Sequence, residues 1–349
     1  MRTNLVLLTI ASVLGIGLGF AGGSLILGVY RDSTFAQPEG SSFENLDELR
    51  QTIDQSDSRD IKPDASVSLR AMIRSHPSDL IIYELVPNLD VRFQRVRVQT
   101  NSHGMRGPEV SLEKPEGTYR IALLGDSFAF GWGVEYPQTF AAEIEHILNE
   151  KKIEGIERVE VLNFGVPGYS TFQEVSSFME KGIAFSPDVV LVYFVNNDFG
   201  LPFFIRDFNN ENSANLTTEH QFRSGESSKN AEGKARAAKF INGINANYWL
   251  STLAAFCGER KIPLSLAINP RRNWKSDFNG LPLLHDQSSA GIEFIPLRDK
   301  FVALIDERGI DRTKLAFKGD PHPTPLMHGL LAELMVPPLE KNLREVASR

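Results

Sequence analysis

The chain of 349 residues has a single cysteine, Cys257. One thiol excludes a disulfide framework within the chain and any zinc site built from several cysteines. Cys257 falls in an apolar pattern of helical period, so we interpret it as a small buried side chain and not as a nucleophile. Nothing in the sequence calls for a bound metal or a cofactor, and we expect neither.

The sequence also lacks an excess of positive charge. It has 37 Lys and Arg against 44 Asp and Glu, a formal net charge of −7. No basic stripe interleaved with aromatic residues is present, which argues against nucleic acid as a partner. We therefore predict that the chain binds no nucleic acid.

The amino-terminal segment lacks charge altogether between residues 5 and 30, with Arg2 before it and Arg31 after it. Such a run is long enough to span a bilayer, and the best cleavage motif, at 34–36, is poor. We interpret residues 1–31 as an uncleaved transmembrane signal anchor, with a cleaved signal as the alternative. The expected location is a single-pass membrane protein whose main domain lies outside the cytoplasm, in the periplasm or the extracellular space.

Small residues recur within this apolar segment. Gly15, Gly19 and Gly23 are four residues apart, which places them on one face of a helix. Such a groove favours close pairing of membrane helices and predicts a homodimer through this face. The alternative is that glycine is simply common in membrane helices.

The region before the main domain has two parts. Residues 32–65 form a polar linker, in which Ser41 and Glu44 resemble a capping box before an amphipathic helix with apolar residues at Phe43, Leu46, Leu49 and Ile53. Residues 66–118 form a small β-rich extension, with strands expected at 80–85 and 91–98.

From residue 119 to residue 349, apolar runs of strand length alternate with helical patterns. We expect strands at 121–124, 159–166, 189–195, 264–268 and 292–297, and helices at 171–184, 241–260 and 326–347, the last interrupted or bent at Pro337-Pro338. This alternation predicts an α/β fold with a parallel sheet and helices on both faces. Residues 199–240 break the rhythm and are interpreted as a flap-like insertion.

Polar clusters follow the strands. Gly125-Asp126-Ser127 comes after the first strand, 163–170 after the second and 196–198 after the third, while 320–323 lies near the carboxyl end. Taken alone, Gly-Asp-Ser is typical of a capped turn before a helix. In a parallel sheet, however, the first three clusters converge on one edge. Together the four supply a hydroxyl, an imidazole, a carboxylate and hydrogen-bond donors, the groups that acyl transfer requires.

Four segments in this order resemble the SGNH (GDSL-type) hydrolase superfamily. They read GDSFAFGWG, NFGVPGYST, VYFVNNDF and DPHPTPLMHGLLAE. The resemblance extends from about residue 120 to the carboxyl end and is weak across the insertion. It implies a flavodoxin-like three-layer α/β/α sandwich that hydrolyses or transfers ester-linked acyl groups.

The resemblance also implies roles for individual residues. Ser127 would be the nucleophile, His322 the base and Asp320 the acid that orients the imidazole. The oxyanion hole would comprise the backbone N–H groups of Ser127 and Gly165 and the side-chain amide of Asn197. Ser127, Asp320 and His322 are thus the predicted catalytic residues.

The chain departs from the family pattern at two places. The acid usually stands three residues before the histidine, where this sequence has Gly319, so a Ser127–His322 dyad remains an alternative. The third segment usually begins with Gly, and here Val195 replaces it, which reduces backbone freedom. His328 is a rival for the base, but it falls within the terminal helix and is expected to pack there.

Several other residues have no assigned chemistry. We expect Asp126 to fix the turn before Ser127. Asn196 is a weaker candidate than its neighbour for the amide donor. An Asn-Ser-x-Gly-x-Arg segment, similar to one in related membrane-anchored chains, spans 101–106, and the sequence assigns it no role. Arg271 and Arg272 follow the fourth strand and would either bind an acidic group of the substrate or lie solvated at the surface.

Three functions remain open at this point. The first is a serine esterase that removes acyl groups from a glycan, a lipid or a small molecule outside the cytoplasm. The second is an O-acyltransferase that passes the acyl group from Ser127 to a sugar hydroxyl of an extracytoplasmic polysaccharide. The third is a non-enzymatic binding scaffold on the same fold. The first two need the same triad, so the sequence does not choose between them.

Overall fold

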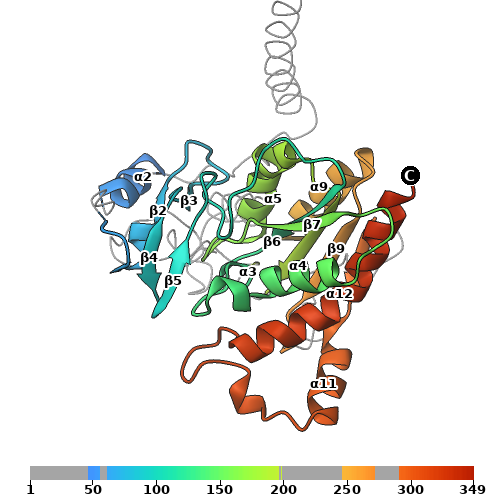
Figure 1. Cartoon of the computed structure of the whole chain (residues 1–349). Coiled ribbons are helices and arrows are strands. Elements are labelled where there is room, and N and C mark those ends of the chain that lie inside the picture. The colour runs from blue at the N-terminus through green and yellow to red at the C-terminus, as the bar shows by residue number, and fades with distance from the viewer. Residues whose placement is uncertain (1–45, 56–60, 196–197, 199–245, 272–290) are drawn as a thin grey trace, which may run out of the picture.

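The computed structural model describes residues 46–55, 61–195, 198, 246–271 and 291–349 (Figure 1). The expected membrane anchor, its Gly15, Gly19 and Gly23 face, and the expected insertion at 199–240 lie outside these residues. Within the part of the chain that is described, no helix combines the length and the apolarity needed to cross a membrane.

The centre of the fold is a parallel sheet of five strands in the order β10-β9-β8-β6-β7. The strands are β6 (Thr118–Leu124), β7 (Arg158–Asn163), β8 (Val189–Phe194), β9 (Leu264–Ile268) and β10 (Ile292–Ile295). In chain order this is the 2-1-3-4-5 arrangement of flavodoxin-like sheets read from the other edge. The order of the strands reverses between β6 and β8, which is where ligands bind in such sheets.

Helices cover both faces of the sheet. Alternate residues of β6 divide between two cores, with Ile121 and Leu123 on one side and Ala122 and Leu124 on the other. The first core is covered by α4 (Phe140–Glu150), α11 (Leu297–Glu307) and α12 (Pro325–Ala347), and the second by α5 (Thr171–Glu180) and α9 (Ala246–Glu259). In Figure 1, α4 and α12 lie on one side of the sheet, and α5 and α9 on the other. The predicted α/β architecture with a parallel central sheet is therefore present.

The terminal helix is present as expected, and of the two alternatives for Pro337-Pro338 the interruption is wrong. Helix α12 continues through Pro337 and Pro338 and is not interrupted there. Each proline removes one backbone hydrogen bond of the helix. Val336 and Leu339, on either side of the proline pair, are buried in the core. Their packing stabilises the helix where the prolines remove backbone hydrogen bonds.

The extension has more strands than the sequence predicted. The expected strand at 91–98 is a hairpin of β4 (Asp90–Phe93) and β5 (Val96–Gln99). Gln94 and Arg95 turn the chain with φ angles of 50° and 72°, a conformation that non-glycine residues rarely adopt, so the pattern gave no turn signal. The other strands are β1 (Ala65–Ser66), β2 (Ile73–Ser75) and β3 (Tyr83–Leu85).

Helix α2 (Leu46–Gln55) is the amphipathic helix expected in the linker, and it packs onto the extension. Leu49 and Ile53 are buried in the same core as the strands. The guanidinium of Arg50 donates to the carbonyl oxygens of His76 and Pro77, both at 3.0 Å. This helix therefore belongs structurally to the extension rather than to a solvated spacer.

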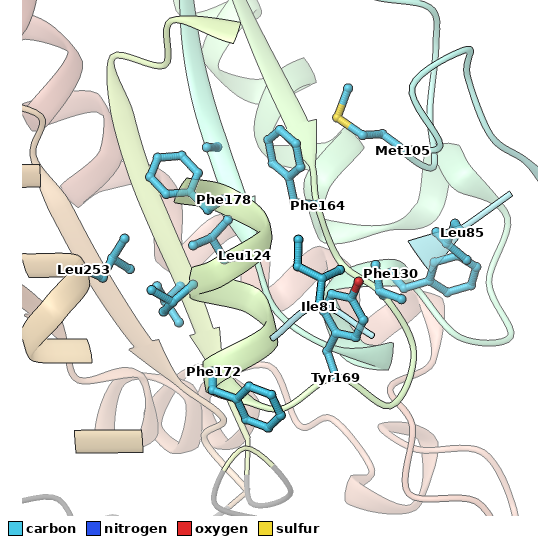
Figure 2. Packing of buried hydrophobic residues seen from close by; sticks show 14 of the residues in the cluster. Ile81, Leu85, Met105, Leu124, Phe130, Phe164, Tyr169, Phe172, Phe178 and Leu253 are labelled. Atoms are coloured by element: carbon cyan, nitrogen blue, oxygen red, sulfur yellow. The ribbon is translucent and has the colours of Figure 1, made fainter. Parts of the chain in front are cut away.

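The extension and the main domain share one core. Ile81, Leu85 and Met105 of the extension belong to the same cluster as Phe164 and Tyr169, and Figure 2 shows them together. The rings of Tyr83 and Tyr169 meet edge to face with centroids 5.2 Å apart. Because this packing adjoins the loop after β7, the extension helps to fix the edge of the sheet where the predicted site lies.

Candidate active site

Ser127 is the first residue of the short helix α3 (Ser127–Phe130), directly beyond strand β6. Gly125 makes the sharp turn with a φ of 156°, and a Cβ there would come within 2.7 Å of the Cβ of Ala129. The carboxylate of Asp126 accepts a hydrogen bond of 2.9 Å from the N–H of Phe128 and caps the helix. The Gly-Asp pair thus builds the turn that presents Ser127, as expected for Asp126.

Three of the predicted residues form a continuous chain of hydrogen bonds. The Oγ of Ser127 lies 2.8 Å from the Nε2 of His322, and the Nδ1 of His322 lies 2.5 Å from the Oδ1 of Asp320. This is the geometry of a nucleophile, its base and the acid that orients the base. The Oγ of Ser127 also lies 3.2 Å from the Oδ2 of Asp126, so the hydroxyl has a second acceptor.

The carboxyl group of Asp320 is held in its ionised form. Burial raises its pKa, but hydrogen bonds from the backbone N–H and the ring of His322 outweigh burial, so the pKa lies below its ordinary value. The backbone bond is 2.9 Å long and ends on the same Oδ1 that faces the ring. A negative charge is therefore in place to stabilise an imidazolium at His322.

The loop that carries the histidine is braced from several directions. The carbonyl of His322 accepts from the N–H of Phe317 at 3.2 Å, and the carbonyl of Phe317 accepts from the N–H of Asp320 at 3.1 Å. Gly319 has a φ of 77° and turns the chain within this loop. The turn brings Asp320 to the imidazole although the acid stands only two residues away.

Arg271 is part of this bracing. Its Nη1 donates to the carbonyl oxygen of Pro321 at 2.7 Å. Arg271 is exposed, as the second of the two sequence alternatives predicted, and this hydrogen bond also ties it to the histidine loop. Arg272 lies outside the described residues.

An aromatic wall, which the sequence analysis missed, encloses the imidazole. The indole of Trp132 stacks on the ring of His322 with centroids 4.6 Å apart and an interplanar angle of 11°. Phe128 meets the same ring at 5.3 Å. The only sequence signal for Trp132 is its place between two glycines in GDSFAFGWG.

The predicted role of Gly165 as an oxyanion donor stays a prediction, and the contacts of this residue argue against it. Its backbone N–H donates to the side-chain oxygen of Asn163 at 2.9 Å, so this group already has an acceptor. A Cβ on Gly165 would come within 2.5 Å of the backbone nitrogen of Phe130. Glycine is required here because the loop packs directly against α3. The sequence pattern alone does not distinguish a glycine needed for packing from one needed for catalysis.

Gly168, three residues further along the same loop, is a better candidate. It has a φ of 81° and lies just before helix α5. Within the described residues, no acceptor for its N–H is recorded. The sequence analysis missed Gly168, although the second glycine of NFGVPGYST could have pointed to it. Asn197, the third predicted donor, lies outside the described residues, as does Asn196.

Two buried carboxyl groups, from Glu174 and Asp198, lie near the turn after β8. Asp198 accepts the N–H of Val195 at 2.6 Å, and its carbonyl accepts from the hydroxyl of Thr171 at 3.2 Å. Burial raises the pKa of Glu174 and of Asp198 well above the ordinary values, and the negative charge of Asp126 adds to the effect. Asp198 thus ties the end of β8 to the start of α5.

The other candidates for chemistry are buried and inert. The Nδ1 of His328 accepts from the N–H of Phe140 at 3.0 Å, and burial lowers the pKa of His328 to about 3. His328 is therefore a neutral packing residue of α12, as expected. Burial raises the pKa of the Cys257 thiol to about 12, which leaves it protonated. Among the described residues, no group of three His, Cys, Asp or Glu is arranged to hold a metal ion.

Comparisons with known proteins give structural neighbours only. No family model matches the sequence, and no curated protein matches it. One similar solved structure is a lipase/acylhydrolase from Enterococcus faecalis, with 18% identity, a TM-score of 0.41, and coverage of 64% of this chain and 96% of that one.

Two further solved structures are similar over comparable lengths. AlinE4, described as an SGNH-hydrolase family esterase, has 21% identity and a TM-score of 0.34, covering 66% of this chain and 99% of its own. A family 3 carbohydrate esterase from Clostridium thermocellum has 15% identity and a TM-score of 0.39, covering 65% of this chain and 99% of its own.

Proposed function

We propose that this chain is a serine hydrolase of the SGNH type that acts on ester bonds. The observation that carries the proposal is the unbroken hydrogen-bond chain from the Oγ of Ser127 through His322 to Asp320. It lies at the point of the sheet where the strand order reverses, beyond the carboxyl end of β6. Ser127 lies 195 residues before His322 in the sequence, so their alignment is a property of the fold.

The geometry supports a two-step acyl transfer. In the first step the Oγ of Ser127 attacks the carbonyl carbon of the ester while the Nε2 of His322 takes the hydroxyl proton. Asp320 stabilises the imidazolium that forms. The tetrahedral intermediate collapses, the imidazolium returns its proton to the leaving alcohol, and the acyl group stays on Ser127.

In the second step a water molecule replaces the alcohol. His322 removes a proton from the water as its oxygen attacks the acyl carbon, and then protonates the Oγ of Ser127 as the carboxylic acid leaves. If a sugar hydroxyl attacks instead of water, the same residues perform O-acyl transfer, which remains the second candidate function.

The oxyanion of both intermediates needs donors. The backbone N–H of Ser127, at the start of α3, has no acceptor within the helix. We add the N–H of Gly168 in place of that of Gly165, and we retain the side chain of Asn197 as the third donor. Each such donor contributes roughly 3 kcal/mol to the transition state.

The location and the natural substrate belong to this proposal as well. The uncharged run at residues 5–30 supports a membrane anchor that holds the catalytic domain outside the cytoplasm, and the glycines at 15, 19 and 23 support pairing with a second copy. A substrate presented there would be an acylated glycan or lipid.

A fluorophosphonate probe and an activated ester test the proposal. We expect the probe to label the wild-type chain and p-nitrophenyl acetate to be hydrolysed, and we expect Ser127→Ala to abolish both. Ser251→Ala, in helix α9, is the matched control. Unlabelled wild-type protein would favour the scaffold alternative. Release of free acetate from an acetylated glycan, as against its transfer to a second glycan, separates the esterase from the acyltransferase.

A further inference from the structure

Arg106 is a buried cation whose partners are backbone carbonyl groups. Its guanidinium donates to the carbonyl oxygen of Phe130 at 2.9 Å and to that of Val134 at 2.6 Å, and it also donates to that of Gly131. Only 1% of Arg106 is exposed, and among the described residues its hydrogen-bond partners are carbonyl oxygens and not carboxylates. A full positive charge is thus used to hold one short stretch of main chain.

The fork of the guanidinium suits this task. Its N–H groups diverge in a plane, so one side chain reaches several carbonyl groups that point toward a common centre. The guanidinium also lies over the ring of Phe130 at 4.7 Å. Gly131 approaches it so closely that a Cβ there would lie 3.0 Å from an Nη1 atom. The end of α3 is therefore packed around Arg106.

The stretch that Arg106 holds is the one that touches the histidine loop. Trp132 stacks on the imidazole of His322, and its other neighbour is Phe93 of the extension, at 4.6 Å and 86°. A Cβ on Gly133 would lie 3.1 Å from the ring of Phe317. The main chain of Phe317 is hydrogen-bonded to that of His322. Arg106 is thus bonded to the main chain on both sides of Trp132, the residue that stacks on the base.

The sequence segment at 101–106 is built to deliver this guanidinium. The side-chain oxygen of Asn101 accepts from the N–H groups of His103 and Met105, each at 3.0 Å, and its Nδ2 donates to the carbonyl of Pro108 at 3.0 Å. Gly104 has a φ of 79° and passes so close to the carbonyl of Leu85 that a Cβ would clash with it. The loop is rigid, and Arg106 leaves it pointing into the main domain.

We propose that Arg106 is a positioning residue for the base: by holding the carbonyl groups at 130, 131 and 134 it fixes Trp132 against the ring of His322. The inference rests on the serine-hydrolase function proposed above. It also gives the β-rich extension a role, since the extension supplies Arg106, which holds this main chain, and Phe93, which packs against Trp132.

A double-mutant cycle on the full-length chain tests this inference. The variants are Arg106→Met, Trp132→Leu and the two combined, and complete labelling with the fluorophosphonate probe counts the competent sites. Per labelled site, each single change is expected to lower kcat for p-nitrophenyl acetate by about tenfold with little change in KM, because the base is misplaced while the binding surface stays. The double variant is expected to lose about tenfold and not about a hundredfold, because both changes remove one and the same constraint.

Two controls keep the test decisive. Arg106→Lys keeps the positive charge but loses the planar fork of N–H donors, so its kcat is expected to lie between that of Arg106→Met and that of wild type. Arg92→Gln removes an exposed arginine of β4 that pairs with Asp64 at 2.8 Å and is expected to behave as wild type. A wild-type kcat per labelled site in Arg106→Met, or a loss in the double variant equal to the product of the single losses, would overturn the inference. Equal activity of Ser127→Ala and wild type would instead overturn the proposed function.

Discussion

The indole of Trp132 lies nearly parallel to the imidazole of His322, with an interplanar angle of 11° and ring centroids 4.6 Å apart. An aromatic face attracts a cation, and the imidazole becomes a cation when it takes the proton of Ser127. The stack therefore favours the charged state that forms during the reaction. It also restricts the rotation of the ring while the Nε2 faces the nucleophile at 2.8 Å.

Replacing the aromatic ring separates these two effects. We expect Trp132→Phe to retain most of the activity and Trp132→Leu to lose about tenfold in kcat, since cation–π contacts contribute about 1 kcal/mol and loss of orientation adds to this. Steady-state rates with an activated ester measure the difference. Equal rates for the two variants would show that the π face contributes nothing.

The acid decides between a triad and a dyad. Because Asp320 holds the Nδ1 of His322 at 2.5 Å, we expect Asp320→Asn to lower kcat by at least about a hundredfold, as loss of the orienting carboxylate does in serine hydrolases. Asp311→Asn is the control, as this exposed residue only caps a short 3₁₀ turn, Arg312–Lys314. A loss of less than about threefold in Asp320→Asn would favour the dyad of Ser127 and His322.

Much of this arrangement was predictable from the sequence because it depends on local pattern. The strand at 264–268 is present with the expected bounds, since a run of buried apolar residues between polar ends has few alternatives. Ser127 lies at the expected edge because a parallel sheet presents the carboxyl ends of its strands there. Asp320 and His322 follow no strand of the sheet, and their place beside Ser127 was implied by the resemblance alone.

What the sequence could not supply depends on contacts between distant segments. Arg106 is buried only because carbonyl groups near residue 131 need a donor, and no local pattern marks a buried arginine. Gly165 and Gly168 stand in one motif, and their roles separate only when the acceptor of each N–H is known. The hairpin turn at Gln94 lacks the usual turn residues, so the two strands read as one.

Gly165 offers a test of the corrected role. We expect Gly165→Ala to destabilise the fold by about 2 kcal/mol, because the new Cβ would lie 2.5 Å from the backbone nitrogen of Phe130 and overpack the contact with α3. Thermal unfolding followed by circular dichroism measures this. Gly258→Ala is the control, since a Cβ on Gly258 meets nothing within 4 Å. A stable Gly165→Ala with a low rate would point back to a catalytic role.

His328 predicts how stability depends on acid. Its pKa is lowered to about 3 in the fold, against an ordinary value of 6.5, so between these values the unfolded chain binds the extra proton. Stability from this group is complete above pH 6.5 and is lost as the pH falls, with a slope of up to about 1.4 kcal/mol per pH unit. His328→Asn, whose side-chain oxygen can still accept from Phe140, is expected to show a shallower slope in urea unfolding between pH 4 and pH 6.5. An unchanged slope would contradict this account.

Glu174 predicts the opposite dependence. Its carboxyl group is buried, neither of its oxygens has a hydrogen-bond partner among the described residues, and burial raises its pKa well above 4.5. The fold then binds a proton that the unfolded chain releases above pH 4.5, so this contribution to stability falls as the pH rises toward the folded pKa.

Glu174→Gln, which mimics the protonated acid, is expected to unfold at higher urea concentration than wild type at pH 8 and to differ less at pH 5. Glu180→Gln, at the exposed end of the same helix, should show neither change. If Glu174→Gln were less stable than wild type at pH 8, this account would be wrong, because the carboxylate of the wild-type chain would then be ionised and stabilised in the fold.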